Sequence, residues 1–194
     1  MTRWPSDEKP EKIRNAALSI FAAQGVDQTS LREVAVSADV SIGLIQHHFG
    51  TKAGLVEAVD RHVTEVIRTT LKSGPGSVTV DDFGEQVTAL LVEHTTVVDY
   101  LARALVEDTP FGSSIFNTLI EMGTARWERR AEEGLTRPGL DTTWAALNIV
   151  LLFFGTVLLR PHVDRLLGEP LLSQMQLGRW GVAVKELMRR GQMK

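Results

Sequence analysis

The stretch from Thr29 to Leu55, TSLREVAVSADVSIGLIQHHFGTKAGL, constrains the fold most, because it carries three helix-start signals in close succession. Ser30 with Glu33 three residues later fits a capping box, in which a hydroxyl and a carboxylate each bond backbone N–H groups at a helix start. Ser41 and Thr51 can cap two further helices in the same way. The spacing predicts two short helices joined by a tight turn and followed by the start of a third.

Apolar residues at helical spacing give each short helix one buried side. In the first they are Leu31, Val34, Ala35 and Ala38, and in the second Ile42, Ile45 and Phe49. The second helix then points Gly43, Leu44, Gln46, His47 and His48 outward. This is the pattern of a helix-turn-helix, whose second helix enters the major groove of DNA. A small helical hairpin inside a globular core is the alternative.

The flanking segments also fit. Upstream, an apolar stripe from Ile13 to Phe21 predicts a scaffold helix that stops at Gly25. Downstream, Thr51 precedes a fourth helix whose inner face carries Leu55 and Val59. Four helices therefore fill residues 8 to 73.

From Ile13 to Val63 the chain resembles the DNA-binding domain of the TetR family of transcriptional regulators. The resemblance lies in elements that occur in order: Gly25, Thr29-Ser30, Val34-Ala35, Val40-Ser41, Gly43, His48-Phe49, Lys52 and Leu55. It covers about the first third of the chain, and the rest is similar only in length and helical pattern. Two positions depart from the family: Gln46 replaces the usual Tyr, and Asp39 replaces a usual Gly. Gln46 can still bond a phosphate or adenine, and Asp tolerates left-handed backbone.

Composition sets the class of protein. The chain has 194 residues, 43% of them hydrophobic, and no cysteine, which excludes disulfides and thiolate metal sites. Its polar start, MTRWPSDEKPEK, is unlike a signal peptide, and the longest apolar run, Ile149 to Leu159, is too short to span a bilayer. We expect a soluble, cytoplasmic protein with no membrane partner.

A break at Ser73-Gly74-Pro75-Gly76-Ser77 precedes the remainder of the chain. Helical segments are predicted from residue 81 to about 94, through Tyr100 to Glu107, and over 110–133, 141–159 and 171–190. No strand-like alternation is present, so the predicted fold is all-α. An N-terminal three-helix domain (1–51) with the helix-turn-helix is joined by a fourth helix (52–73) to a C-terminal helical ligand-binding and dimerisation domain (78–194).

The segment 141–159 is apolar on almost every side, so it must be covered all round. One side packing in the body and the other against a second subunit would achieve this, and the resemblance also implies a C-terminal dimer. A buried helix in a monomer is the alternative. The predicted interface residues are Leu151, Phe154, Leu158, Met175, Leu177, Trp180 and Val184.

A homodimer would present two helix-turn-helix units to a pseudo-palindromic double-stranded operator. Gln46 and His47 are predicted to contact bases or phosphates, with Leu44 meeting a thymine methyl, and Gly43 and His48 lie in the same helix. Predicted phosphate contacts are Thr29, Arg32, Ser41 and Lys52. Residues 1–73 contain nine basic and nine acidic residues, so no broadly basic patch is visible. Any of these side chains could instead be simply solvated.

The resemblance implies a small, apolar effector held in the C-terminal domain. Candidate ligand contacts are Leu90, His94, Tyr100, Phe111, Phe116, Leu119, Met122, Trp127 and Trp144, although the same residues could simply fill the core. No nucleotide, hydrolase or metal-binding motif occurs, and adjacent His47 and His48 cannot share one metal from a helix. We expect no catalytic residue, metal or cofactor. The expected function is a ligand-released repressor, with a helical protein-binding adaptor or, less favoured, a small helical enzyme as alternatives.

Overall fold

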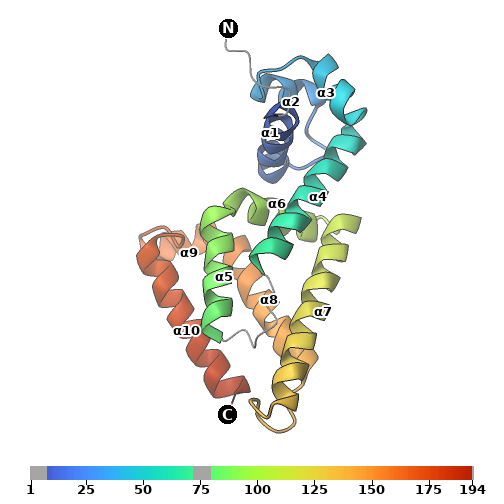
Figure 1. Ribbon diagram of the computed structural model, residues 1–194. Helices are drawn as coiled ribbons and strands as arrows, with labels where there is room; N and C mark the ends of the chain where they lie inside the picture. Colours follow the sequence, from blue (N-terminus) through green and yellow to red (C-terminus); the bar gives the residue numbers. More distant parts are fainter. Residues whose placement is uncertain (1–7, 72–79, 194) are drawn as a thin grey trace.

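The computed structural model describes residues 8–71 and 80–193, and within these ranges it is helical throughout apart from loops and one isolated bridge between Thr136 and Met193. The all-α prediction is confirmed. The helices, shown in Figure 1, are α1 (Glu8–Gln24), α2 (Leu31–Ser37), α3 (Ile42–Phe49), α4 (Lys52–Thr70), α5 (Val80–Glu93), α6 (Thr95–Val106), α7 (Pro110–Glu132), α8 (Thr142–Leu158), α9 (Arg160–Leu167) and α10 (Gln174–Gln192).

Helices α1, α2 and α3 form a small head at one end of the molecule, and α4 runs from it into the body formed by α5 to α10 (Figure 1). The head has its own apolar centre, in which Ile13, Phe21, Val34, Ile45 and Leu55 are almost completely buried. These are the residues at helical spacing in the sequence, so the pattern alone determines which face of each helix points inward.

The predicted helix starts are present in the head. Ser30 Oγ accepts from the Glu33 backbone N–H at 3.2 Å, and the Glu33 carboxylate accepts from the Ser30 N–H at 2.7 Å. Thr51 Oγ1 accepts from the Gly54 N–H at 3.1 Å. At the end of α1, Gly25 has a φ of 89°, a left-handed conformation that stops the helix as expected.

The body is a bundle in which α7 packs closely along α8, while α5 lies between α4 and α10 (Figure 1). The approach of α7 to α8 is tight at Gly123, where an added Cβ would lie 2.9 Å from the Ala146 Cβ. The approach of α6 to α7 is tighter still, because a Cβ on Gly112 would lie 2.4 Å from the Ala104 carbonyl oxygen. Glycine at these two positions lets the helix backbones meet.

The structure corrects the predicted helices at two places, and one further prediction falls outside the described residues. The fourth helix ends at Thr70 instead of 73. Helix α9 was not predicted, because Pro161 was not recognised as a first-turn residue, a position where its missing N–H costs nothing. The predicted break at 73–77 lies outside the described residues.

The head is held to the body by side chains of α6 as well as by α4. Arg103 on α6 donates from Nε to the Ala22 carbonyl oxygen at 3.0 Å and from Nη2 to that of Ala23 at 2.8 Å. The Tyr100 hydroxyl donates to Asp60 Oδ1 on α4 at 2.7 Å. Helix α6 therefore contacts both α1 and α4, which fixes how the head sits on the body.

None of the described helices is by itself long and apolar enough to cross a membrane. Helices α8 and α9 pass that test only when taken together, and a 70° bend separates them.

Candidate DNA-binding face and body cavities

Helix α3 presents a polar outer face above a buried anchor. Ile45 is fully buried, whereas Gly43, Gln46, His47 and His48 are exposed. The helix begins at Ser41, whose Oγ accepts from the Leu44 N–H at 3.2 Å. The two histidine rings lie 5.1 Å apart and edge to face. A short, capped helix with one face free and the other anchored can enter a groove without disturbing the core behind it.

The turn before α3 has the conformation that the sequence required. Asp39 adopts a φ of 51°, in the left-handed region where the family usually has glycine. The turn is closed by bonds from the Asp39 N–H to the Val36 oxygen at 3.1 Å and from the Val40 N–H to the Ala35 oxygen at 3.0 Å. The turn therefore survives the substitution, because Asp is among the few non-glycine residues that tolerate this region.

The other predicted DNA contacts divide into exposed and occupied side chains. Arg32 and Ser41 are exposed, and Lys52 is half-buried with Nζ 3.4 Å from the Asp27 carbonyl oxygen. Leu44 is half-buried against the core. The prediction that Thr29 contacts a phosphate is wrong, because only 3% of this residue is exposed and its hydroxyl donates to the Gly25 carbonyl oxygen at 2.7 Å. Thr29 thus ties α1 to α2 and cannot reach a phosphate.

The capping box also sets the electrostatics at the start of α2. The backbone N–H and hydroxyl of Ser30 lower the pKa of Glu33, with smaller contributions from Gln24 and Lys52. The carboxylate is thus held ionised at the positive end of the helix dipole.

Residues 13–59 match the sequence profile of the family described as bacterial regulatory proteins, tetR family. The head therefore carries a sequence match to the N-terminal domain of this family. The match coincides with α1 to the first half of α4, so it covers the helix-turn-helix just described. The matched family is one of regulatory proteins, in line with the expectation that the chain is a regulator.

Two curated relatives are informative. The chain is 28% identical over 134 residues to the HTH-type transcriptional regulatory protein RaaS of Mycobacterium tuberculosis, covering 67% of this chain and 60% of that protein. It is 35% identical over 107 residues to the HTH-type transcriptional repressor Rv3405c of the same organism, covering 55% and 51%. The chain thus spans about half to three-fifths of the length of these relatives.

The whole fold is similar to solved structures. A TetR family transcriptional regulator from Chloroflexus aurantiacus superimposes with a TM-score of 0.74 at 18% identity, covering 99% of this chain and 96% of that one. At this identity the likeness establishes the fold, including the helical body beyond the matched profile.

The body holds two small cavities between its helices, called the internal cavities below. One, of about 70 Å³, lies between the end of α4, α7 and α8, and Arg126 and Arg130 contribute to its lining. The other, of about 60 Å³, is lined only by apolar side chains from α4, α5, α6, α7 and α8. Leu71, Leu119 and Ile149 line both cavities, so the two adjoin.

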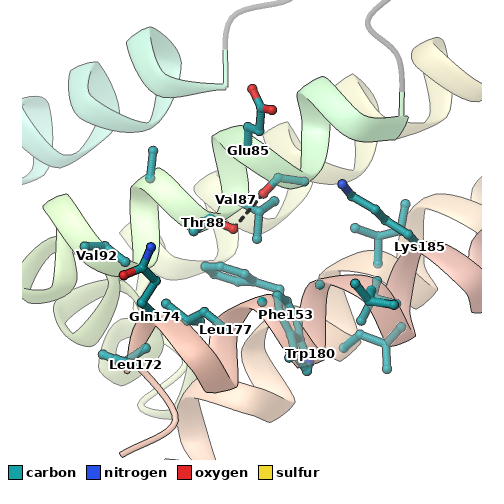
Figure 2. Close-up of a pocket in the computed structure, with 18 of the residues that line it drawn as sticks. Glu85, Val87, Thr88, Val92, Phe153, Leu172, Gln174, Leu177, Trp180 and Lys185 are labelled. Carbon is teal, nitrogen blue, oxygen red and sulfur yellow. Dashed lines mark hydrogen bonds between the residues drawn. The ribbon is translucent and has the colours of Figure 1, made fainter.

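A larger groove of about 800 Å³ opens between α5 and α10, with α8 as its floor. Figure 2 shows Phe153 and Trp180 within it and Glu85 and Lys185 on one side. The Thr88 hydroxyl, on the α5 wall, donates to the Gly84 carbonyl oxygen at 2.9 Å. Ile149 lines the groove and both internal cavities, so the groove adjoins the cavities at this residue.

Four of the nine candidate ligand residues line an internal cavity: Leu90, Leu119, Met122 and Trp127. The other five candidates line neither internal cavity. The rings of Tyr100 and Phe111 contact each other near the head, tilted and with centroids 5.8 Å apart, and His94 lies at the start of α6. Phe116 lines a shallow surface hollow, and Trp144 is 57% exposed.

Cavity residues that were not predicted from the sequence include Leu71, Arg126, Arg130, Ile149 and Val150. For the two arginines the available signal was their spacing, four residues apart on either side of Trp127.

The predicted interface residues also divide. Leu151, Leu158 and Met175 are 55%, 46% and 55% exposed, so their apolar side chains are available on the surface. The prediction that Phe154 and Leu177 lie at a dimer interface is wrong, because both are buried inside the protomer and belong to its core. Trp180 and Val184 line the groove between α5 and α10.

Proposed function

We propose that this protein is a transcriptional repressor that binds a pseudo-palindromic DNA operator as a homodimer and releases it when a small effector occupies the body. The observation that carries the DNA-binding part is the outer face of α3. Gly43, Gln46 and His47 are exposed there over a fully buried Ile45, on a helix capped at its start by Ser41. That face meets the requirement of a recognition helix for the major groove.

Within this proposal, Gln46 and His47 contact base edges, because a Gln amide can bond adenine N6 and N7 together. Ser41, Arg32 and Lys52 contact phosphates and position the head without reading sequence. The N-termini of α2 and α3 supply further N–H groups for phosphate. Since residues 1–73 carry no net charge, we expect binding to depend on two heads acting together.

Dimerisation is supported by exposed apolar side chains on α8 and α10. On α8 the exposed residues Trp144, Leu151 and Leu158 recur at intervals of seven, and on α10 Met175 and Val182 do the same. Residues at this spacing share one face of a helix. Each helix therefore offers exposed apolar side chains along one face, which a second copy of the chain would cover.

The test of DNA binding is selection of bound duplexes from a random pool by the purified protein, followed by affinity measurement on the enriched sequence. We expect a two-fold symmetric motif and an affinity that falls steeply with salt, because phosphate contacts release counterions. Gln46→Ala should relax the preference at one base pair of each half-site, whereas Arg61→Ala, an exposed change on α4, should leave it intact. Enrichment of no symmetric motif would refute the proposal.

The test of the dimer is sedimentation of Leu151→Glu beside Val36→Glu. Both residues are exposed, at 55% and 77%, but Val36 lies on α2 in the head. We expect Leu151→Glu alone to shift the protein toward a monomer. A wild-type monomer at micromolar concentration, or equal effects of the two changes, would contradict the proposed interface.

A further inference from the structure

The two internal cavities form an unequal pair. Their walls share Leu71, Leu119, Ile149 and Val150, and beyond these the first cavity includes charged residues while the second is entirely apolar. Their volumes are about 70 and 60 Å³. Because one water-sized group needs about 10 to 15 Å³ of such space, the pair together accepts roughly ten non-hydrogen atoms.

The charged end is formed by Arg126 and Arg130, one helical turn apart on α7. Arg130 is only 6% exposed, and its guanidinium carbon lies 5.6 Å from the centre of the Trp127 ring. Its Nη1 is also 3.8 Å from the Met193 sulfur. Trp127 thus holds one guanidinium at the edge of the cavity.

The electrostatics of this end favour an anion. Burial lowers the pKa of both arginines, and for Arg126 the neighbouring cations Arg130 and Arg129 lower it further. Both side chains make additional interactions within the protein. A guanidinium carries five N–H donors, so it can bond more than one acceptor at a time. A negative group at this end would relieve the repulsion between neighbouring positive charges.

We propose that the two cavities bind a small amphiphile, with an anionic head group at Arg126 and Arg130 and a short apolar tail along Leu119, Ile149 and Val150. This proposal rests on the proposed function, because it names the chemical class of the effector. Access is through the groove of Figure 2, since Ile149 and Met188 line both the groove and the charged cavity. Met188 is unbranched and flexible, so its side chain can move aside.

The site also touches the helix that carries the head. Leu71, which directly follows α4 as its C-cap, lines both cavities, and Ile67 one turn earlier lines the apolar one. A tail in the cavities would therefore lie directly against the end of α4.

The test compares three probes with the same tail and different head groups: octanoate, 1-octanol and octylammonium. Octanoate has the size that the cavities accept. Binding is measured by calorimetry on the unaltered, full-length protein. We expect octanoate to bind about tenfold or more tightly than octanol, because a charge-assisted bond to a buried guanidinium is a strong one. Octylammonium should bind most weakly.

Two variants locate the head group. Arg126→Gln should reduce the preference for octanoate over octanol to within about threefold. Arg129→Gln is the matched control, because Arg129 is exposed on the same helix and lines neither cavity. It should keep the full preference. If Arg126→Gln does not fold, the comparison of head groups on the unaltered protein still decides the question.

Equal binding of octanoate and octanol, tighter binding of octylammonium, or saturable binding of none of the three would overturn this proposal. An equal loss in Arg126→Gln and Arg129→Gln would overturn it as well. Operator binding is measured separately without any probe. A protein that binds DNA but no octanoate refutes only the effector class, whereas one that binds octanoate but no DNA refutes the proposed function.

Discussion

Replacing Arg103 by Met tests whether α6 holds the head in place. Ala22 and Ala23 lie in the last turn of α1, where helix carbonyls have no partner within the helix. Arg103 supplies those partners with bonds of 3.0 and 2.8 Å across 81 and 80 residues of chain. Methionine keeps most of the aliphatic packing but removes both donors.

The expected cost follows from the geometry. Hydrogen bonds that involve a charged group contribute about 1.5 to 3 kcal/mol each. The Arg103 side chain is 35% exposed, so water screens the charge and can reach the freed carbonyls. We therefore expect the free energy of unfolding to fall by about 2 kcal/mol for the two bonds together. Urea denaturation measures this as a lower midpoint at unchanged slope.

Two controls separate the carbonyl bonds from the ion pair. Arg103 also contacts Glu107 at 3.1 Å, and Arg68 makes a similar pair with Glu65 at 2.9 Å. The Arg68 pair is largely exposed and should contribute only about 0 to 1 kcal/mol. Arg68→Met and Glu107→Gln should therefore both have small effects. If Arg103→Met destabilised the protein no more than Arg68→Met, the bonds to α1 would not hold the head.

Three further changes test local features. Asp39→Ala should lower the free energy of unfolding by up to about 1 kcal/mol, because alanine keeps the Cβ at a φ of 51° but lacks the short polar side chain that lets Asp tolerate this region. Asp39→Gly should be neutral or stabilising, because it removes the Cβ. Gly112→Ala should cost about 3 kcal/mol or more, since its Cβ would meet the backbone of Ala104, whereas Gly191→Ala, with open space around it, should not destabilise. The pKa of Glu33 is lower in the folded protein than its usual value of 4.5, so the ionised carboxylate adds stability at a pH above 4.5, and this stability is lost as the pH falls through the folded pKa. Glu33→Gln should therefore flatten the acid side of a plot of unfolding free energy against pH.

The head could be predicted in detail because its signals are local. A capping box, a hydroxyl cap and an apolar residue every three or four positions each act within one or two turns, so Ser30, Ser41 and Ile45 could be assigned without knowing the rest of the molecule. Thr29 was misassigned although its partner, the carbonyl oxygen of Gly25, is only four residues away. The sequence does not distinguish a threonine hydroxyl that is buried against a helix end from an exposed one that can bond a phosphate.

The body was harder because its features depend on how helices meet. That 141–159 forms an apolar helix was evident, but which side faces the core depends on the approach of α7 at Gly123. Phe154 therefore lies in the core and Leu151, three residues earlier, on the surface. The cavities were equally hidden, since their walls combine α4 to α8 and α10, and no periodicity indicates where packed side chains fail to fill space.

Helix α6 connects the cavity with the head. Val97, Val98 and Leu101 line the apolar cavity, while Arg103 on the same helix bonds the end of α1. A ligand that displaces α6 must therefore also displace those bonds or carry α1 with it. These bonds amount to about 2 kcal/mol. If they are broken in the effector-bound protein but not in the effector-free protein, operator affinity could change by at most roughly thirtyfold per head. An effector response larger than this would require a further route, and the end of α4 at Leu71, which lines both cavities, provides one.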